Sequence, residues 1–168
     1  MPISDYMRAL RAKVGHDVVL TPSVTGLVFD DTGRLLLARH ATADLWAAPG
    51  GAIDPDERPV DAVVRELWEE TGLHVEPVAL AGVFGGPEFR VRYENGDVTA
   101  YVISMFECRV LAGRPRPHGD EIRELRWVGR DELAALTLSP WARVMLPQLF
   151  ESRGRPLVPT PTWRPPVG

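Results

Sequence analysis

The chain has little cysteine, no long apolar run and no excess of positive charge. Its single cysteine, Cys108, excludes a disulfide framework within the chain. No segment approaches the roughly 18 consecutive apolar residues of a transmembrane helix, and the first residues lack the apolar core of a secretory signal. The net charge of −4 argues against a nucleic-acid polymer as partner, because nucleic-acid binders are usually basic. We therefore expect a cytoplasmic protein without a membrane or a nucleic-acid polymer as its partner.

What is present is the composition of an ordinary globular domain. With 168 residues, of which 45% are hydrophobic and 25% charged, the chain can bury one core and is not a disordered or fibrous protein. We expect a helix and a short strand in residues 1–20, the main domain in residues 21–152 and a separate tail in residues 153–168. The tail is expected to be extended because it holds five of the sixteen prolines.

Apolar periodicity and turn residues predict a mixture of helices and strands. Helices are expected at residues 4–14, 59–71 and 139–151, and strands at residues 18–20, 23–29, 34–39, 79–84, 89–93, 98–110 and 125–128. The turn at residues 30–33 predicts that the strands on either side of it form a hairpin, and Asn95-Gly96 predicts a second hairpin. Together these elements predict an α+β fold with a mixed sheet and helices on both sides.

The helix expected at residues 59–71 carries three glutamates close together. At 100° per residue, Glu66, Glu69 and Glu70 fall within an arc of about 100°. The other side of the helix is predicted to enter the core and consists of Val60, Val63, Val64, Leu67, Trp68 and Thr71. Like charges on one helix face repel one another, and a bound cation relieves the repulsion. Carboxylate oxygens suit Mg²⁺ or Mn²⁺, and no cysteine or histidine near them in the sequence indicates zinc.

The spacing around these glutamates is more specific than the helix face alone. The segment reads Gly51, five residues, Glu57, seven residues, and then Arg65-Glu66-Leu67-Trp68-Glu69-Glu70-Thr71-Gly72-Leu73. This pattern matches every constrained position of the Nudix box, so the chain resembles the Nudix hydrolases. A looser resemblance extends over residues 22–149. It implies an αβα sandwich around a central mixed β-sheet, in which the box forms a loop, a helix and a second loop.

The resemblance also implies an activity. Nudix hydrolases typically cleave the diphosphate bond of a nucleoside diphosphate linked to another group, and a metal-activated water attacks the phosphorus. By their match to the box, Glu66, Glu69 and Glu70 are expected to bind Mg²⁺ or Mn²⁺, together with the backbone carbonyl of Gly50. The protein is therefore expected to be a metal-dependent pyrophosphohydrolase.

Two further roles are to hold the loop of the box against its helix and to accept a proton from the attacking water. Glu57 and Arg65 are expected to join this loop to the helix and to support the metal ligands. A general base must also accept a proton from the attacking water. Glu66 and Glu69 are candidates within the box. Glu121 is a candidate outside it, because the family often supplies an extra acid from a loop ahead of a late strand.

Five other residues are candidates for binding the substrate. Arg39 ends a predicted strand just before the irregular loop, and Arg90 alternates along another strand, so both are expected to contact phosphate. Trp46, Phe84 and Phe89 are candidates for stacking on the base. The alternative for these three aromatic residues is the core, where such side chains are more often found.

The identity of the substrate stays open at this level. ADP-ribose or a similar nucleotide sugar is the first expectation, because Pro87 follows the box much as a proline does in ADP-ribose pyrophosphatases of the family. A nucleoside triphosphate, including an oxidised one, is the alternative. The leaving group is often recognised by a dimer partner in this family, so a homodimer is one expected assembly.

Two other functions are compatible with the same fold. A nucleotide-binding module without catalysis usually lacks box glutamates, and this chain keeps all of them. An isopentenyl-diphosphate isomerase would need a cysteine in a loop near the site, whereas Cys108 is expected in the middle of a strand and buried.

Overall fold

The structure is a computed structural model that describes residues 4–165. Its elements in chain order are α1 (Asp5–Val14), β1 (Val18–Val28), β2 (Leu35–His40), β3 (Trp46–Ala47), α2 (Pro59–Thr71), β4 (His74–Phe84), the 3-10 turn η1 (Pro87–Phe89), β5 (Arg90–Arg92), β6 (Val98–Ala112), β7 (Ile122–Val128), the 3-10 turn η2 (Arg130–Ala135) and α3 (Pro140–Glu151). None of the helices within the described residues is long and apolar enough to cross a membrane.

The strands form two sheets. In the larger sheet the order is β1-β6-β4, and β5 pairs with β6 beside this path. The pairing of β1 with β6 is parallel, whereas β4 and β5 pair with β6 in the antiparallel sense, so the sheet is mixed. The smaller sheet has the order β3-β2-β7. The α+β class with a mixed central sheet, predicted from the sequence, is confirmed.

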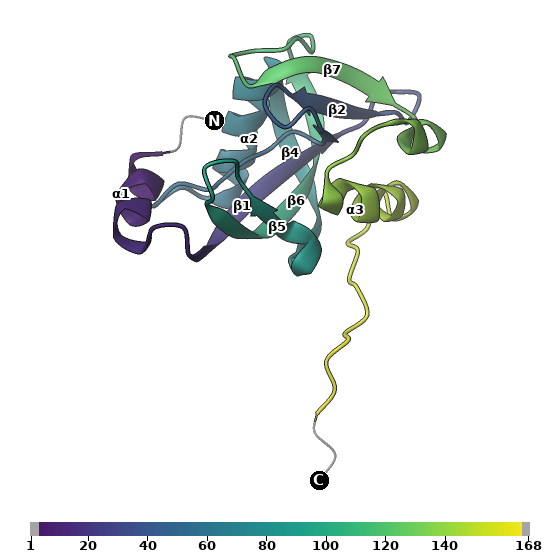
Figure 1. Cartoon of the computed structure of the whole chain (residues 1–168). Helices are drawn as coiled ribbons and strands as arrows, with labels where there is room; N and C mark the ends of the chain where they lie inside the picture. The colour runs from purple at the N-terminus through teal and green to yellow at the C-terminus, as the bar shows by residue number, and fades with distance from the viewer. Residues whose placement is uncertain (1–3, 166–168) are drawn as a thin grey trace.

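Two hydrophobic clusters hold the layers together. Val24 and Val28 of β1 pack in the cluster that contains the apolar side chains of α2. Leu27, on the other face of β1, packs in the cluster that contains the apolar side chains of α3. Because successive side chains of a strand point to opposite faces, one strand can serve both clusters. The helices α2 and α3 thus lie on different sides of the central strands (Figure 1).

The first predicted hairpin is wrong. The strands expected at residues 18–20 and 23–29 form one strand, β1, which pairs with β6 rather than with β2. The turn itself is present, since Gly33 N donates to the carbonyl of Asp30 at 3.0 Å. One isolated bridge, Phe29 with Leu35, joins the two strands among the described residues. The physical reason is that the other edge of β1 is occupied by the loop ahead of α2, because the amide of Val24 donates to the carbonyl of Gly51.

Most other elements follow the prediction. Ser4 caps α1 and accepts a hydrogen bond from Met7 N, and α2 has the predicted bounds. The hairpin through Asn95-Gly96 joins β5 to β6. Strands β4 and β7 begin earlier than predicted, at His74 and Ile122. Residues 156–165 have no regular secondary structure. Leu157 N donates to the carbonyl of Ala81 at 2.7 Å, and the chain beyond it leads away from the body of the protein (Figure 1).

Candidate active site

Helix α2 is rotated relative to the orientation that its apolar residues predict. Glu66 and Glu70 are buried, with 0% and 3% of their surface exposed. Val60 and Trp68, which were expected in the core, are 44% and 51% exposed. Only Glu69 keeps the exposed carboxylate that was expected of all three glutamates, with 52% of its side-chain surface accessible. The rotation is possible because loops from outside the helix cover the glutamate side, which the helical periodicity does not report.

The loop ahead of α2 contacts the carboxylate of Glu70 through the backbone of Gly50. The amide of Gly50 donates to Oε2 of Glu70 at 2.9 Å. The carbonyls on either side, those of Pro49 and Gly51, accept hydrogen bonds from β1, which leaves the Gly50 carbonyl out of this pairing. A Cβ atom on Gly50 would lie 2.2 Å from the carbonyl oxygen of Val24, so only glycine fits at this position.

Arg65 connects the loop and the helix. Its Nε and Nη2 donate to the two carboxylate oxygens of Glu57, both at 2.8 Å, which is a bidentate pair. Nη2 also donates to the carbonyl of Ala52 at 3.1 Å. Nη1 donates to Glu66 at 2.8 Å and to Glu69 at 3.1 Å. One guanidinium group therefore fixes the loop and orients two of the three glutamates.

The buried glutamates carry more negative charge than their surroundings compensate. Oε2 of Glu66 is buried and has no hydrogen-bond partner. Burial raises the pKa of Glu66 to about 7, although Arg65 opposes the shift. Burial also raises the pKa of Glu70 to about 8, against the hydrogen bond from Gly50. The charge of Glu121 adds to both pKa shifts, so a carboxylate distant in the sequence acts on this site.

Glu121 reaches the site through the loop between β6 and β7. The amides of Arg116 and His118 donate to the last carbonyls of α2, those of Thr71 and Glu70, at 3.0 and 3.3 Å. Beyond this contact, the carbonyl of Glu121 accepts a hydrogen bond from Ala41 N at 2.8 Å. The loop glutamate singled out from the sequence therefore comes near the box helix.

The donor set fits a hard divalent cation. As they stand, no three His, Cys, Asp or Glu side chains within residues 4–165 converge closely enough to hold a metal ion. Oε2 of the buried Glu66 nevertheless has no hydrogen-bond partner, and a bound cation would supply one. Carboxylate and carbonyl oxygens are the ligands that Mg²⁺ and Mn²⁺ prefer. Glu69 is the exposed member of the set and accepts a hydrogen bond from Arg65, so it would have to turn from Arg65 to join the other two at a cation.

The three aromatic residues considered for base stacking lie in the core instead. Trp46, Phe84 and Phe89 are between 3% and 4% exposed and belong to the hydrophobic cluster under α3. Phe89 stacks on the ring of Trp141, with ring centroids 6.4 Å apart. Their ring faces are covered by other side chains and offer no surface to a base. The core alternative holds for all three.

The two arginines considered for phosphate differ in their surroundings. The Nε of Arg39 lies 2.9 Å from Asp44, and its Nη1 lies 3.6 Å from Glu124, so two carboxylates already neutralise this side chain. Arg90 is exposed on β5. It borders a hollow of about 330 Å³ that Pro87 and Tyr101 also line.

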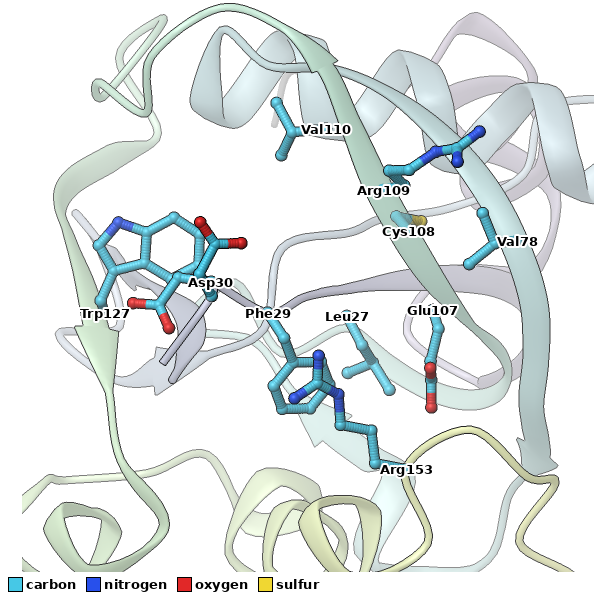
Figure 2. A pocket seen from close by; sticks show the side chains of 11 residues that line it. Leu27, Phe29, Asp30, Val78, Glu107, Cys108, Arg109, Val110, Trp127 and Arg153 are labelled. Carbon is cyan, nitrogen blue, oxygen red and sulfur yellow. The ribbon is translucent and has the colours of Figure 1, made fainter. Parts of the chain in front are cut away.

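A larger hollow lies at the other end of β7 from Glu121. It has a volume of about 420 Å³, and its lining includes Trp127, Glu107 and Arg153 (Figure 2). None of the residues that line it was a candidate for the site. Cys108 also lines this hollow, and burial raises the pKa of its thiol to about 12. Cys108 is the single cysteine of the chain, and it lies in this hollow and not in the glutamate cluster, so it does not stand where an isomerase would need it.

Two histidines belong to the surroundings of the site although the sequence assigned them no role. His40 ends β2, and its pKa is lowered by burial, while the charge of Glu121 opposes the shift. His118 lies in the loop that crosses the end of α2. Neither shares a spacing with the box, because tertiary contacts bring them there. No sequence signal indicated them, because Trp68, which contacts His118, was itself predicted to lie in the core.

The fold and the glutamate cluster together define a class of hydrolases that cleave phosphoanhydride bonds. The chain belongs to the Nudix family, because the family model of the NUDIX domain matches residues 19–149. Members of this family generally need divalent metal ions.

Individual relatives agree with this assignment. The chain is 33% identical over 144 residues to a protein from Streptomyces ambofaciens named MutT-like, and the match covers 82% of this chain and 86% of that protein. It is 30% identical over 107 residues to a protein from Bacillus subtilis (strain 168) provisionally named an 8-oxo-dGTP diphosphatase, with 64% and 65% covered. Among solved structures, an ADP-ribose pyrophosphatase from Streptococcus suis 89-1591 is similar, with a TM-score of 0.64, 25% identity and coverage of 80% of this chain and 92% of that chain.

Proposed function

We propose that this Nudix hydrolase is a metal-dependent pyrophosphohydrolase that cleaves the diphosphate linkage of a nucleoside diphosphate joined to another group. One observation carries the proposal. Two carboxylates, those of Glu66 and Glu70, are buried in the box helix with raised pKa values, and one of their oxygens has no partner. Such groups are costly to the fold unless they serve a bound cation or a reaction.

The ligands of the metal would be Glu66, Glu69, Glu70 and the carbonyl of Gly50. A bound Mg²⁺ or Mn²⁺ neutralises charge on the diphosphate and lowers the pKa of a coordinated water. The contribution of the chain is to hold these oxygens in place. Arg65 does so from the side, since its pair with Glu57 keeps the guanidinium at a fixed distance from the carboxylates.

The proton of the attacking water needs an acceptor that is not occupied as a ligand. Glu121 is our first candidate, because its charge acts on both buried glutamates and its backbone is held by Ala41. Glu69 and Glu66 are the alternatives within the box. A carboxylate that fully coordinates a metal is a weak base, which favours the residue outside the box.

The substrate we propose first is ADP-ribose or a similar nucleotide sugar. The similarity to the Streptococcus suis structure, which is named an ADP-ribose pyrophosphatase, supports it. Pro87 and the exposed Arg90 border one hollow, and Arg90 is available there for a phosphate or a sugar hydroxyl. Arg39 stays a phosphate candidate only if substrate displaces it from Asp44. An oxidised nucleoside triphosphate is the second candidate, which the Bacillus subtilis relative supports.

A substrate panel tests the proposal. Purified protein with Mg²⁺ or Mn²⁺ is incubated with ADP-ribose, UDP-sugars, dGTP and 8-oxo-dGTP, and the products are separated and identified. We expect AMP and ribose 5-phosphate from ADP-ribose. Turnover of the triphosphates alone would favour the second candidate, and binding without turnover of any substrate would identify a nucleotide-binding module. Sedimentation of the same preparation tests the homodimer, which would cover the exposed apolar side chains of Leu20 and Val83.

A further inference from the structure

The loop between β6 and β7 lies across the last turn of the box helix. We name residues 113–121 the strap. The carbonyls at the end of an α-helix lack partners within the helix, and the strap supplies two. Arg116 N donates to Thr71 O at 3.0 Å, and His118 N donates to Glu70 O at 3.3 Å. The strap begins equally close to the helix, because a Cβ on Gly113 would lie 2.6 Å from the carbonyl oxygen of Gly72.

A pair of aromatic rings adds to these backbone contacts. The rings of His118 and Trp68 meet edge to face, with centroids 5.9 Å apart and an angle of 64° between their planes. Nδ1 of His118 is buried without a hydrogen-bond partner. The imidazole therefore contributes its ring to this contact and not a hydrogen bond from that nitrogen. Such edge contacts between rings depend on their shape and orientation.

The strap leads from this pair to the catalytic side of the helix. Trp68 is two residues beyond Glu66, so the two side chains leave the helix about 200° apart. The strap passes round the helix end from the side of Trp68, and at Gly119 it runs close to the carbonyl of Glu69, since a Cβ atom on Gly119 would lie 3.8 Å from that oxygen. It then reaches Glu121, whose carbonyl is held by Ala41 N. Glu121 is thus fixed between an anchor on the helix and an anchor at the end of β2.

We infer that Trp68 and His118 are positioning residues, which clamp the strap onto α2 and so hold Glu121 beside the buried glutamates. The inference rests on the proposed catalytic role of Glu121. Neither ring takes part in the reaction. Trp68 occupies an unconstrained position of the box, so its role belongs to this chain and not to the motif.

The first test removes each ring separately. For Trp68→Ala and for His118→Ala we expect kcat to fall roughly tenfold, which is the size of effect common for contacting residues, while KM changes less than twofold. His118→Phe and Trp68→Phe keep an aromatic edge and should retain most of kcat. The matched controls are Trp163→Ala in the exposed tail and His74→Ala at the exposed start of β4, and both should behave as wild type.

Hydrogen exchange reports on the clamp without reference to activity. In metal-free protein, the amides of Arg116 and His118 should exchange at least about tenfold faster in the two alanine variants than in wild type, because their bonds to α2 open more often. Amides in β6 should be unaffected. Unchanged exchange at Arg116 and His118 in both alanine variants would overturn the clamp.

A double-mutant cycle separates positioning from a general loss of structure. If Trp68 acts through Glu121, Trp68→Ala should lower kcat no further once Glu121 is replaced by Gln. Additive losses would overturn the inference, and so would full activity of both alanine variants beside an impaired Glu121→Gln. If Glu121→Gln itself keeps normal kcat, the proposed base is wrong, whereas the exchange experiment still decides whether the rings hold the strap.

Discussion

Two buried acidic sites in this protein differ in how far their surroundings compensate the negative charge. Asp97, after the turn between β5 and β6, is 9% exposed. Its carboxylate lies 2.7 Å from Nδ1 of His16 and 3.7 Å from Nε of Arg11, and it accepts a hydrogen bond from the side-chain Nδ2 of Asn95 at 2.9 Å. The hydrogen bond to His16 and these other partners lower the pKa of Asp97. This site joins α1 to the sheet and is complete as it stands.

The box glutamates Glu66 and Glu70 are more deeply buried than Asp97, with 0% and 3% of their surface exposed, and they lack such compensation. Glu66 accepts a hydrogen bond from Arg65 on one oxygen and none on the other, and Glu70 accepts one from a backbone amide. Their pKa values are raised where that of Asp97 is lowered. A buried carboxylate with matched partners supports the fold, whereas one left unmatched marks a place for a cation. The contrast therefore distinguishes the box glutamates from Asp97 without reference to the motif.

The largest expected effect is on turnover. Glu70→Gln or Glu69→Gln should lower kcat at least about a hundredfold, because each removes a charge expected to bind the metal. Asp97→Asn, a matched change at the other acidic site, should keep kcat within about twofold of wild type. Steady-state kinetics at saturating Mg²⁺ measure both. More than a third of wild-type turnover in either glutamine variant would show that the ligands are wrongly assigned.

The next effect is on stability in the presence of metal. Binding to the folded state at a hundred times Kd adds about 2.7 kcal/mol, which corresponds to a rise in Tm of roughly 5–10 °C for a chain of this size. We expect this rise between metal-free protein and 20 mM Mg²⁺. Asp97→Asn should lower Tm at every Mg²⁺ concentration but keep the rise. Glu70→Gln should lose it, and a flat Tm for wild type would argue against a preformed site.

The pH dependence of stability without metal should also distinguish the two sites. The folded-state pKa values of Glu66 and Glu70, about 7 and about 8, lie above their ordinary value of 4.5. Between these limits the folded protein binds more protons than the unfolded chain, so stability falls as pH rises from about 4.5 to about 8. Asp97 has a lowered folded-state pKa and acts in the opposite sense, since its contribution is lost at acidic pH.

Thermal unfolding in EDTA measures both slopes. Glu70→Gln should flatten the decline of Tm between pH 5 and 8, because the amide does not titrate. Asp97→Asn should leave this decline intact and reduce the loss of Tm below pH 4. A wild-type Tm that rises steadily from pH 5 to pH 8 would show that the box glutamates are not held in an unfavourable ionised state.

The bounds of α2 could be predicted from the sequence because they depend on local signals. Pro59 at its start and Gly72 in the left-handed conformation at its end define it, whatever packs around it. The orientation of the helix could not be predicted, since Trp68 is half exposed and Glu66 fully buried. Helical periodicity reports which residues are apolar, but loops from elsewhere in the chain decide which side is covered.

The same distinction applies to the site. The motif identified Glu57 and Arg65, and their bidentate pair is present. The motif could not indicate that the ring of Trp46 would be buried in the core, because that depends on how α3 packs. The false hairpin between β1 and β2 has a similar cause. A favourable turn was present, but β6 occupies one edge of β1 and the loop ahead of α2 occupies the other, which leaves no edge for β2.

The smallest expected effect concerns the arginine side chain that lies beside each of the two acidic sites. Arg11 faces Asp97 and completes that site, whereas Arg65 donates to Glu66 and Glu69, where it would compete with the proposed metal for the same oxygens. The pair with Glu57 restrains this competition, because it holds two of the guanidinium nitrogens. Glu57→Gln weakens the restraint and should let Arg65 bind the box glutamates more closely.

We therefore expect Glu57→Gln to raise the Mg²⁺ concentration for half-maximal activity roughly tenfold, as is common for residues that support metal ligands. The value of kcat at saturating Mg²⁺ should change little, since all ligands remain. Asp61→Asn, an exposed acid on the first turn of the same helix, is the matched control for the loss of one negative charge. If both variants shift the Mg²⁺ dependence equally, the effect is long-range charge. If Glu57→Gln lowers kcat but leaves the Mg²⁺ dependence unchanged, Arg65 does not compete with the metal, and the loop position itself is what Glu57 protects.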